Sequence, residues 1–282
     1  MPDSLLTEKQ KSKITLALKN GNYKTVISVL ESVKTPHAGT AKTKDKRFVL
    51  KEIIYHLNEK NKNGRALEKD FFSLGLRFCR MKEDTAKQIG VSLIWKGYGY
   101  SKEKVKAVLL KIADHPNWEV RESAGSAFAN TLYYNEEFYN TLKKWSKHKS
   151  PNIRRAVVIG AVGLRDKKNP KGVTKAFKLL EPLLYDPTTY VKKNLGPFVI
   201  GSYYGNSYPL ELLNQLNKWI KIKNPNVRWN IAMTFNNSFG NRNPEQALKF
   251  LKILSKDKSP IVQRAVKSTL NHLRKRNKNF NC

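Results

Sequence analysis

The sequence predicts an all-α protein, a right-handed helical solenoid in which two-helix repeats follow one another along the chain. Three observations predict this fold class. A short motif recurs five times at nearly constant spacing, apolar residues between the copies follow helical periodicity, and no segment reads as a β-strand. We therefore expect an α-α superhelix with no sheet.

The repeated motif places a proline before a β-branched residue, which one or two basic residues follow in most copies. Successive prolines are 35, 36, 38 and 35 residues apart, a period that fits two antiparallel helices and their turns. A proline in the first turn of a helix gives up an N–H that has no helical partner in any case. Each copy is therefore expected to start a helix, and the prolines are Pro116, Pro151, Pro187, Pro225 and Pro260.

A second helical pattern follows the motif helices. Leu179, Leu180, Leu183 and Leu184 show its character, because their spacing forms one apolar stripe on a helix. The second helices are expected at residues 136–147, 173–184, 210–222 and 244–255.

The first part of the chain is less regular. Residues 48–54, 71–78 and 89–95 have helical patterns, Ser101 has the character of a helix start, and residues 35–46 form the longest expected loop. We therefore predict a single domain over residues 1–282, with atypical N-terminal helices in 1–81 and regular repeats in 82–282.

The chain is strongly basic, with 54 Lys and Arg against 22 Asp and Glu and a net charge of +32. Residues 141–282 hold 29 basic and 6 acidic residues, a net charge of +23, which leaves +9 for residues 1–140. Solubility alone does not need so one-sided an excess, and nucleic acid is the commonest polyanion. We expect double-stranded DNA as the partner, bound through its phosphate backbone mainly by the second half.

Other classes of protein are disfavoured. The first residues lack the basic stretch and apolar run of a secretory leader, and no apolar segment is long enough to span a bilayer. Only Cys79 and Cys282 are present, so no disulfide framework is expected. The five histidines lack metal-ligand spacing, and no P-loop or dinucleotide glycine motif occurs. We expect a soluble, cytoplasmic, nucleoid-associated monomer without metal, cofactor or membrane contact.

Aligning the copies on their β-branched residue, here called the anchor, compares equivalent helix faces. The anchors are Val120, Ile153, Val191, Val227 and Val262. The next position, the first column, holds Arg121, Arg154, Lys192, Arg228 and Gln263. The position after it, the second column, holds Glu122, Arg155, Lys193, Trp229 and Arg264. Stacked repeats bring equivalent positions side by side, so both columns are expected to form a basic wall that binds DNA phosphates.

Glu122 is the one acid in the second column, where it would oppose binding to a polyanion. It lies four residues after Trp118, so the carboxylate and the indole share a helix face one turn apart. One interpretation gives the pair a chemical role. The other is structural, with Glu122 in a salt bridge to Arg155 or Arg121 and Trp118 packing in the turn.

Two segments resemble a known family. Residues 118–122 (Trp-Glu-Val-Arg-Glu), followed one repeat later by 153–156 (Ile-Arg-Arg-Ala), are similar to the signature of the HEAT-like-repeat DNA alkylation repair glycosylases, the AlkD/AlkC-like family. In that family a Trp is followed four residues on by an acid and in the next repeat by an Arg. Residues 39–42 (Gly-Thr-Ala-Lys) leading to 48–54 are similar to its N-terminal pattern.

The resemblance implies HEAT-like repeats and a DNA glycosylase that excises cationic alkylated purines. It implies a catalytic carboxylate role for Glu122, a lesion-contacting aromatic at Trp118 and a phosphate contact at Arg155. The sequence departs from the best-known branch in having Glu in place of Asp, and Pro197 beside Phe198 where that branch has a second Trp. These differences indicate another branch, with a different lesion preference or weaker activity. Trp229 and Phe198 are the candidates for the second aromatic.

Two other functions stay open. The first is a non-catalytic HEAT-type module that binds duplex or branched nucleic acid through the same basic wall. The second is a scaffold for an acidic protein partner. Glu122 discriminates among the three, because an enzyme needs that carboxylate whereas a pure binder tolerates Gln there.

Overall fold

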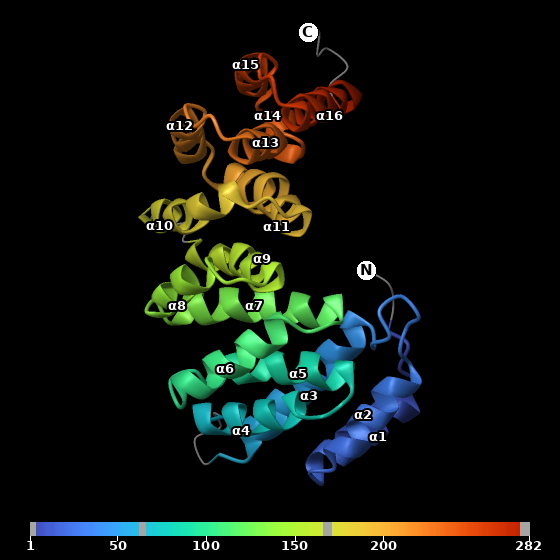
Figure 1. Cartoon of the computed structure of the whole chain (residues 1–282). Helices are drawn as coiled ribbons and strands as arrows, with labels where there is room; N and C mark the ends of the chain where they lie inside the picture. The colour runs from blue at the N-terminus through green and yellow to red at the C-terminus, as the bar shows by residue number, and fades with distance from the viewer. Residues whose placement is uncertain (1–3, 62–65, 166–170, 277–282) are drawn as a thin grey trace. The chain divides into compact units, whose positions relative to one another are not determined.

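The structure is a computed structural model of the chain, and it describes residues 4–61, 66–165 and 171–276 (Figure 1). Within these ranges the regular structure is helical, apart from one isolated antiparallel bridge between Lys34 and Ala41. The prediction of an all-α fold is confirmed. The chain divides after Ala127, within α7, into two compact units, which are described in turn.

The first unit contains α1 to α6 and the start of α7. The bounds are α1 Glu8–Lys19, α2 Tyr23–Ser32, α3 Thr43–Glu59, α4 Glu68–Cys79, α5 Asp84–Ile94, the 3₁₀ turn η1 Trp95–Gly97, α6 Lys102–Ala113 and α7 Trp118–Tyr134. Helices α3 to α6 cover the predicted segments, whereas α1 and α2 lie outside them. The predicted loop at 35–46 is shorter, because α3 already begins at Thr43.

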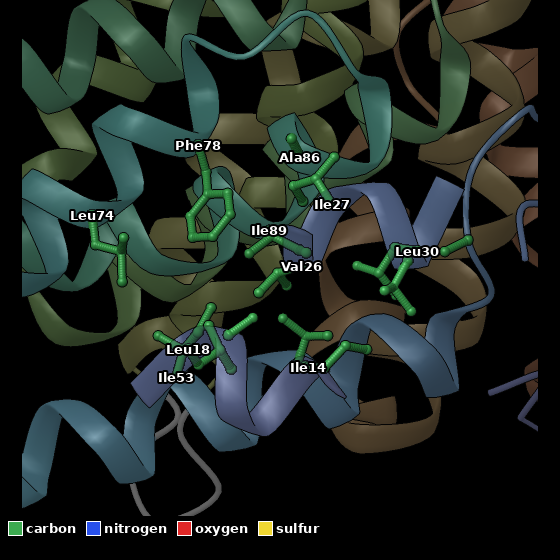
Figure 2. Close-up of a cluster of buried hydrophobic side chains, with 14 of the residues drawn as sticks. Ile14, Leu18, Val26, Ile27, Leu30, Ile53, Leu74, Phe78, Ala86 and Ile89 are labelled. Atoms are coloured by element: carbon green, nitrogen blue, oxygen red, sulfur yellow. The ribbon is translucent and has the colours of Figure 1, made fainter. Parts of the chain in front are cut away.

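An apolar cluster holds the first unit together (Figure 2). Its labelled members come from α1 to α5 and are Ile14, Leu18, Val26, Ile27, Leu30, Ile53, Leu74, Phe78, Ala86 and Ile89.

Helices α4 and α5 approach closely at Gly90, where a Cβ would meet the backbone and sulfur of Cys79. Burial raises the pKa of this free thiol to about 12, while Cys282 lies outside the described residues.

The second unit contains the rest of α7 and the regular helix pairs. The bounds are α8 Phe138–Trp145, α9 Pro151–Gly160, η2 Ala161–Leu164, α10 Lys171–Leu180, η3 Glu181–Tyr185, α11 Thr189–Asn194, η4 Leu195–Gly205, α12 Pro209–Trp219, α13 Pro225–Thr234, α14 Ser238–Arg242, α15 Pro244–Leu254 and α16 Pro260–Arg276. The predicted second helices correspond to α8, α10, α12 and α15, each of which ends within about one turn of its predicted end.

The five motif helices share one register, because each begins two residues before its anchor. All five anchor side chains are at most 2% exposed. Proline is the first helical residue in α9, α13 and α16, whereas Pro116 and Pro187 lie two residues before their helices. Ser150 and Asn224 cap α9 and α13 by accepting N–H groups of the first turn. The alignment on the anchor therefore compares equivalent positions of equivalent helices.

The segment η4 is an 11-residue π-helix, a form that the sequence pattern did not indicate. It packs against α13 at small residues: a Cβ on Gly196 would lie 2.7 Å from the carbonyl oxygen of Asn230, and one on Gly201 would meet the carbonyl oxygen of Thr234. Asn237 Nδ2 donates to the carbonyl of Pro197 at 2.7 Å. The two glycines thus allow α13 to approach η4 closely, and Asn237 supplies a donor to one backbone carbonyl of the π-helix.

Among the described residues, no helix combines the length and the hydropathy that a bilayer span requires.

Candidate nucleic-acid interface and catalytic carboxylate

Trp118 and Glu122 lie on the first two turns of α7 in the first unit. Trp118 is 42% exposed, and Glu122 is partly exposed. The His37 ring meets the indole edge-to-face, with ring centroids 5.4 Å apart and an interplanar angle of 70°. An exposed aromatic surface and a carboxylate therefore share one helix face, as the spacing predicts.

Asn117 fixes the start of α7. Its Oδ1 accepts the N–H of Glu119 at 2.9 Å, while its Nδ2 donates to Asp84 Oδ2 at 2.9 Å and to the carbonyl of Ala38 at 2.8 Å. The loop that contains His37 is thereby tied to the helix that carries Trp118. The orientation of the indole is set by contacts far apart in the sequence.

Glu119 forms a second tie between α7 and the preceding helices. Its carboxylate accepts hydrogen bonds from Thr40 Oγ1 and, at 3.1 Å, from Gln88 Nε2, and it pairs with Lys46 Nζ at 3.4 Å. Burial by itself would raise the pKa of Glu119, but the hydrogen bonds from Thr40 and Gln88 and the charge of Lys46 hold it below its ordinary value. Burial lowers the pKa of Lys46 despite the opposing charge of Glu119.

Sequence reasoning missed this cluster. The partners of Glu119 lie 31 to 79 residues before it in the chain. An isolated Glu beside Trp118 carries no local signal that distinguishes it from an exposed helix residue.

The cluster predicts how stability depends on pH. Because the folded-state pKa of Glu119 lies below the unfolded value of about 4.3, its ionisation stabilises the protein fully above that pH. The stabilisation is lost as the pH falls through the folded-state pKa. Urea titrations between pH 6 and pH 3 should show a shallower acid loss for Glu119→Gln than for the wild type, whereas Glu8→Gln, at an exposed carboxylate, should follow the wild type. Parallel curves for all three proteins would contradict the role of Glu119.

Three side chains of the first column bind the turns that precede their own helices. Arg154 Nη1 donates to the carbonyls of His148 and Lys149, each at 2.8 Å. Arg121 Nη1 donates to the carbonyls at the same two positions of its own repeat, at 2.7 and 2.6 Å. In its own repeat, Gln263 Nε2 donates to the backbone carbonyl of Asp257 at 3.0 Å, the first of these two positions.

First-column residues also link consecutive repeats of the second unit. Arg154 Nε pairs with Asp186 Oδ2 at 2.5 Å, and Arg228 Nη1 pairs with Asp257 Oδ2 at 2.7 Å. Both acids stand five residues before the next anchor. Burial would raise the pKa of Asp186, but hydrogen bonds from Arg154 and Thr188 hold it below its ordinary value.

Lys192, the buried member of the first column, makes a different link. Its Nζ donates to Asn226 Oδ1 at 3.1 Å and lies 4.9 Å from the centre of the half-buried Trp229 ring. The geometry thus gives first-column residues structural contacts, and their phosphate contacts stay a prediction.

The second column is more accessible at two positions. Lys193 and Arg264 are exposed, and both stay predicted phosphate contacts. Arg155 is only 3% exposed, donates from Nη2 to Asn194 Oδ1 at 3.1 Å, and lies over the Tyr190 ring with its Cζ 5.4 Å from the ring centre. Arg155 belongs to the second unit, whereas Trp118 and Glu122 belong to the first.

Phe198, considered for the position of a second active-site aromatic, is 49% exposed on η4. Within the described residues no three His, Cys, Asp or Glu side chains gather as a potential metal site.

Comparison with known proteins finds no protein-family model that matches the chain and no matching curated protein. Solved structures with similar helices include YibA of Escherichia coli, with 13% identity, a TM-score of 0.35 and coverage of 97% of this chain and 99% of that chain. An engineered protein from a structural genomics consortium has 13% identity, a TM-score of 0.32 and coverage of 73% and 97%. A designed armadillo repeat protein has 18% identity, a TM-score of 0.27 and coverage of 79% and 99%. The helices themselves, with five motif copies in one register, make the chain a helical-repeat protein.

Proposed function

We propose that the protein is a DNA glycosylase that excises cationic alkylated purines from duplex DNA in base excision repair. One observation carries the proposal. The only acid of the second column, Glu122, shares a face of α7 with the exposed indole of Trp118.

The chemistry needs little more than a positioned carboxylate. An alkylated purine with a formal positive charge is a good leaving group, and its N-glycosidic bond breaks with the electron pair going to the base. The sugar becomes oxocarbenium-like, and the charge of Glu122 offsets the positive charge that develops there. Water then adds to C1′ and releases a proton, which leaves an abasic site and a free base. The same carboxylate can orient that water.

Trp118 provides selectivity. The face of an indole attracts a cation by its ring quadrupole, so a cationic base is favoured over its neutral parent without a hydrogen-bonding pocket. The contact with His37 and the ties through Asn117 hold the ring at the start of α7. A preoriented ring loses little conformational freedom when the lesion binds.

The test of this function is direct. The protein is incubated with methylated duplex DNA, and free purine bases and abasic sites are measured. We expect release of cationic methylated purines from the duplex and none of their neutral parents. Absence of excision on several cationic adducts would overturn the glycosylase assignment.

DNA affinity is expected to come from phosphate contacts, because the second half carries the basic excess. Binding to undamaged duplex should weaken log-linearly with salt and depend little on sequence. Lys193→Ala and Arg264→Ala should each reduce the salt slope by about one unit, whereas Lys9→Ala, an exposed lysine of α1, should leave it unchanged. A flat salt response, or unchanged slopes in both variants, would show that these residues do not face DNA.

A second candidate function is a non-catalytic module that binds duplex or branched nucleic acid. The observation that favours it is the distribution of charge, since exposed Lys193 and Arg264 and the basic excess lie in the second unit, while Glu122 lies in the first. Salt-dependent binding without excision by the wild type would support this function.

A further inference from the structure

The turns that precede three of the motif helices carry lysine in a repeated register. Lysine stands six and four residues before the anchors of α9, α13 and α16, and all six side chains are exposed. We call these residues the turn-lysine ridge: Lys147, Lys149, Lys221, Lys223, Lys256 and Lys258. The ridge is absent from the turn before α11, which has Tyr185 and Pro187 at these positions.

The residue between the two lysines of each turn is directed inward. His148 Nδ1 accepts the N–H of Ser150 at 3.0 Å, and Asp257 pairs with Arg228. The third residue at this position, Ile222, is half-buried. In each turn the middle residue faces inward, and the lysines on either side of it therefore both face solvent.

First-column side chains hold two of these turns in place. Arg154 binds the carbonyls of His148 and Lys149, and Gln263 binds the carbonyl of Asp257. A fixed backbone presents its lysines without a further cost of ordering the loop. The guanidinium of Arg154 is thus occupied in supporting the turn, and the lysines supply the accessible charge.

The six ammonium groups are available to a partner. None of them has a hydrogen bond or an ion pair within the described part of the chain. Asp257 is the one acid adjacent to them in sequence, and its carboxylate is engaged by Arg228.

The motif helices of the second unit stack in order. Helix α11 packs on α9, η4 packs on α13, and α13 packs on α16, so the ridge follows the stack (Figure 1). Packed helices lie about 8–10 Å apart, which is comparable to three steps of about 3.4 Å along one DNA strand. The turns before α13 and α16 belong to neighbouring repeats, so their lysines can contact phosphates of one strand. The turn before α9 lies two repeats before that of α13 and continues the ridge beyond the lysine-free turn before α11.

From this register, exposure and spacing, we propose that the turn-lysine ridge is the main phosphate-binding surface of the protein and that it tracks one strand of duplex DNA. The proposal rests on the DNA binding in the proposed function, but not on the excision chemistry. In this proposal most of the DNA affinity comes from the six turn lysines, which the sequence motif did not single out, and not from the arginines of the first column.

The test compares two variants with the same change of charge. In the ridge variant all six lysines become Gln. In the control variant six exposed lysines of the second helices become Gln, at Lys143, Lys144, Lys178, Lys218, Lys249 and Lys252. Binding to an undamaged 20-base-pair duplex is followed by fluorescence anisotropy over a range of KCl concentrations, and thermal melts verify that both variants are folded.

We expect the ridge variant to lose affinity by on the order of a hundredfold or more near 0.1 M salt, with a salt slope smaller by about five units. The control variant should lose much less of either. Variants of single turns, Lys221→Gln with Lys223→Gln and Lys256→Gln with Lys258→Gln, should each lower the slope by about two units.

The outcomes separate the ridge from the function it rests on. Wild-type binding to duplex with equal losses in ridge and control variants would overturn the ridge and leave DNA binding standing. Absence of duplex binding by the wild type would overturn both. Tighter wild-type binding to duplex RNA or to polyglutamate than to duplex DNA would overturn the choice of partner. If the ridge variant at saturating concentration excises the base at the wild-type single-turnover rate, the ridge acts in binding, separately from the role of Glu122 in excision.

Discussion

Glu122→Gln is expected to slow the excision of a cationic methylpurine by on the order of a hundredfold or more, comparable to the loss of one preorganised electrostatic group. The substitution keeps the size and hydrogen-bonding capacity of the side chain and removes its charge. A sugar with oxocarbenium character then loses the negative group that stabilises it. Single-turnover release of free base measures the effect.

Binding should change in the opposite direction. If the surface around Glu122 faces phosphates as proposed, removing its negative charge should leave the affinity for undamaged duplex unchanged or slightly higher. Trp118→Ala should lose the preference for cationic over neutral bases, because the aromatic face is gone. Full excision by a well-folded Glu122→Gln protein would rule out the catalytic role.

Glu119→Gln is the matched control, since Glu119 stands three residues earlier on α7 and lies within a structural cluster. It should lower the melting temperature but leave the excision rate per folded molecule at the wild-type level. If Glu122→Gln instead lowers the melting temperature and excision falls only in proportion to folded protein, Glu122 belongs to a structural pair.

Arg154→Met is expected to destabilise the fold by roughly 3 kcal/mol. The side chain of Asp186 is 4% exposed, and Arg154 is its ion-pair partner. Without the guanidinium, Asp186 keeps a buried charge and two turn carbonyls lose a donor. The free energy of unfolding is measured in urea.

The double-mutant cycle with Asp186→Asn isolates the pair. The cost of Arg154→Met should be clearly smaller in the Asp186→Asn background, because the uncompensated charge is then absent. Lys193→Met, at an exposed second-column position, should leave stability nearly unchanged. If Arg154→Met instead keeps wild-type stability and loses one unit of salt slope, the residue binds phosphate and the pair with Asp186 is incidental.

The repeat was predictable from the sequence because its signals are local. A proline, a capping side chain and an apolar anchor lie within a few residues of one another, and each acts on its own helix start. The burial of all five anchors and the common register of their helices agree with that prediction. The shared face of Trp118 and Glu122 was likewise predictable, since it depends only on the geometry of one helix turn.

Contacts between repeats were not predictable in this way. The sequence ranks Arg154 and Arg228 with the exposed cations, but Asp186 and Asp257, about 30 residues later in the chain, pair with them. The close approach of α13 to Gly196 and Gly201 of the π-helix η4 likewise joins residues that are more than 30 positions apart in the sequence. The same holds for Glu119, whose partners come from three other segments of the first unit.

The amino-acid sequence by itself determined the all-α repeat, its helix starts, its buried anchors and the excess of positive charge in its second half, because each follows from composition or from neighbours along the chain. Tertiary structure alone decided which Lys and Arg side chains are engaged by other residues of the protein and which are exposed to solvent. The two columns predict a basic wall that binds phosphates. In the folded chain the first-column side chains Arg154 and Arg228 pair with carboxylates, Arg154 also binds turn carbonyls, and the turn lysines stay exposed. Whether a charged group meets a carboxylate or solvent depends on residues one repeat away, which only the folded chain brings together.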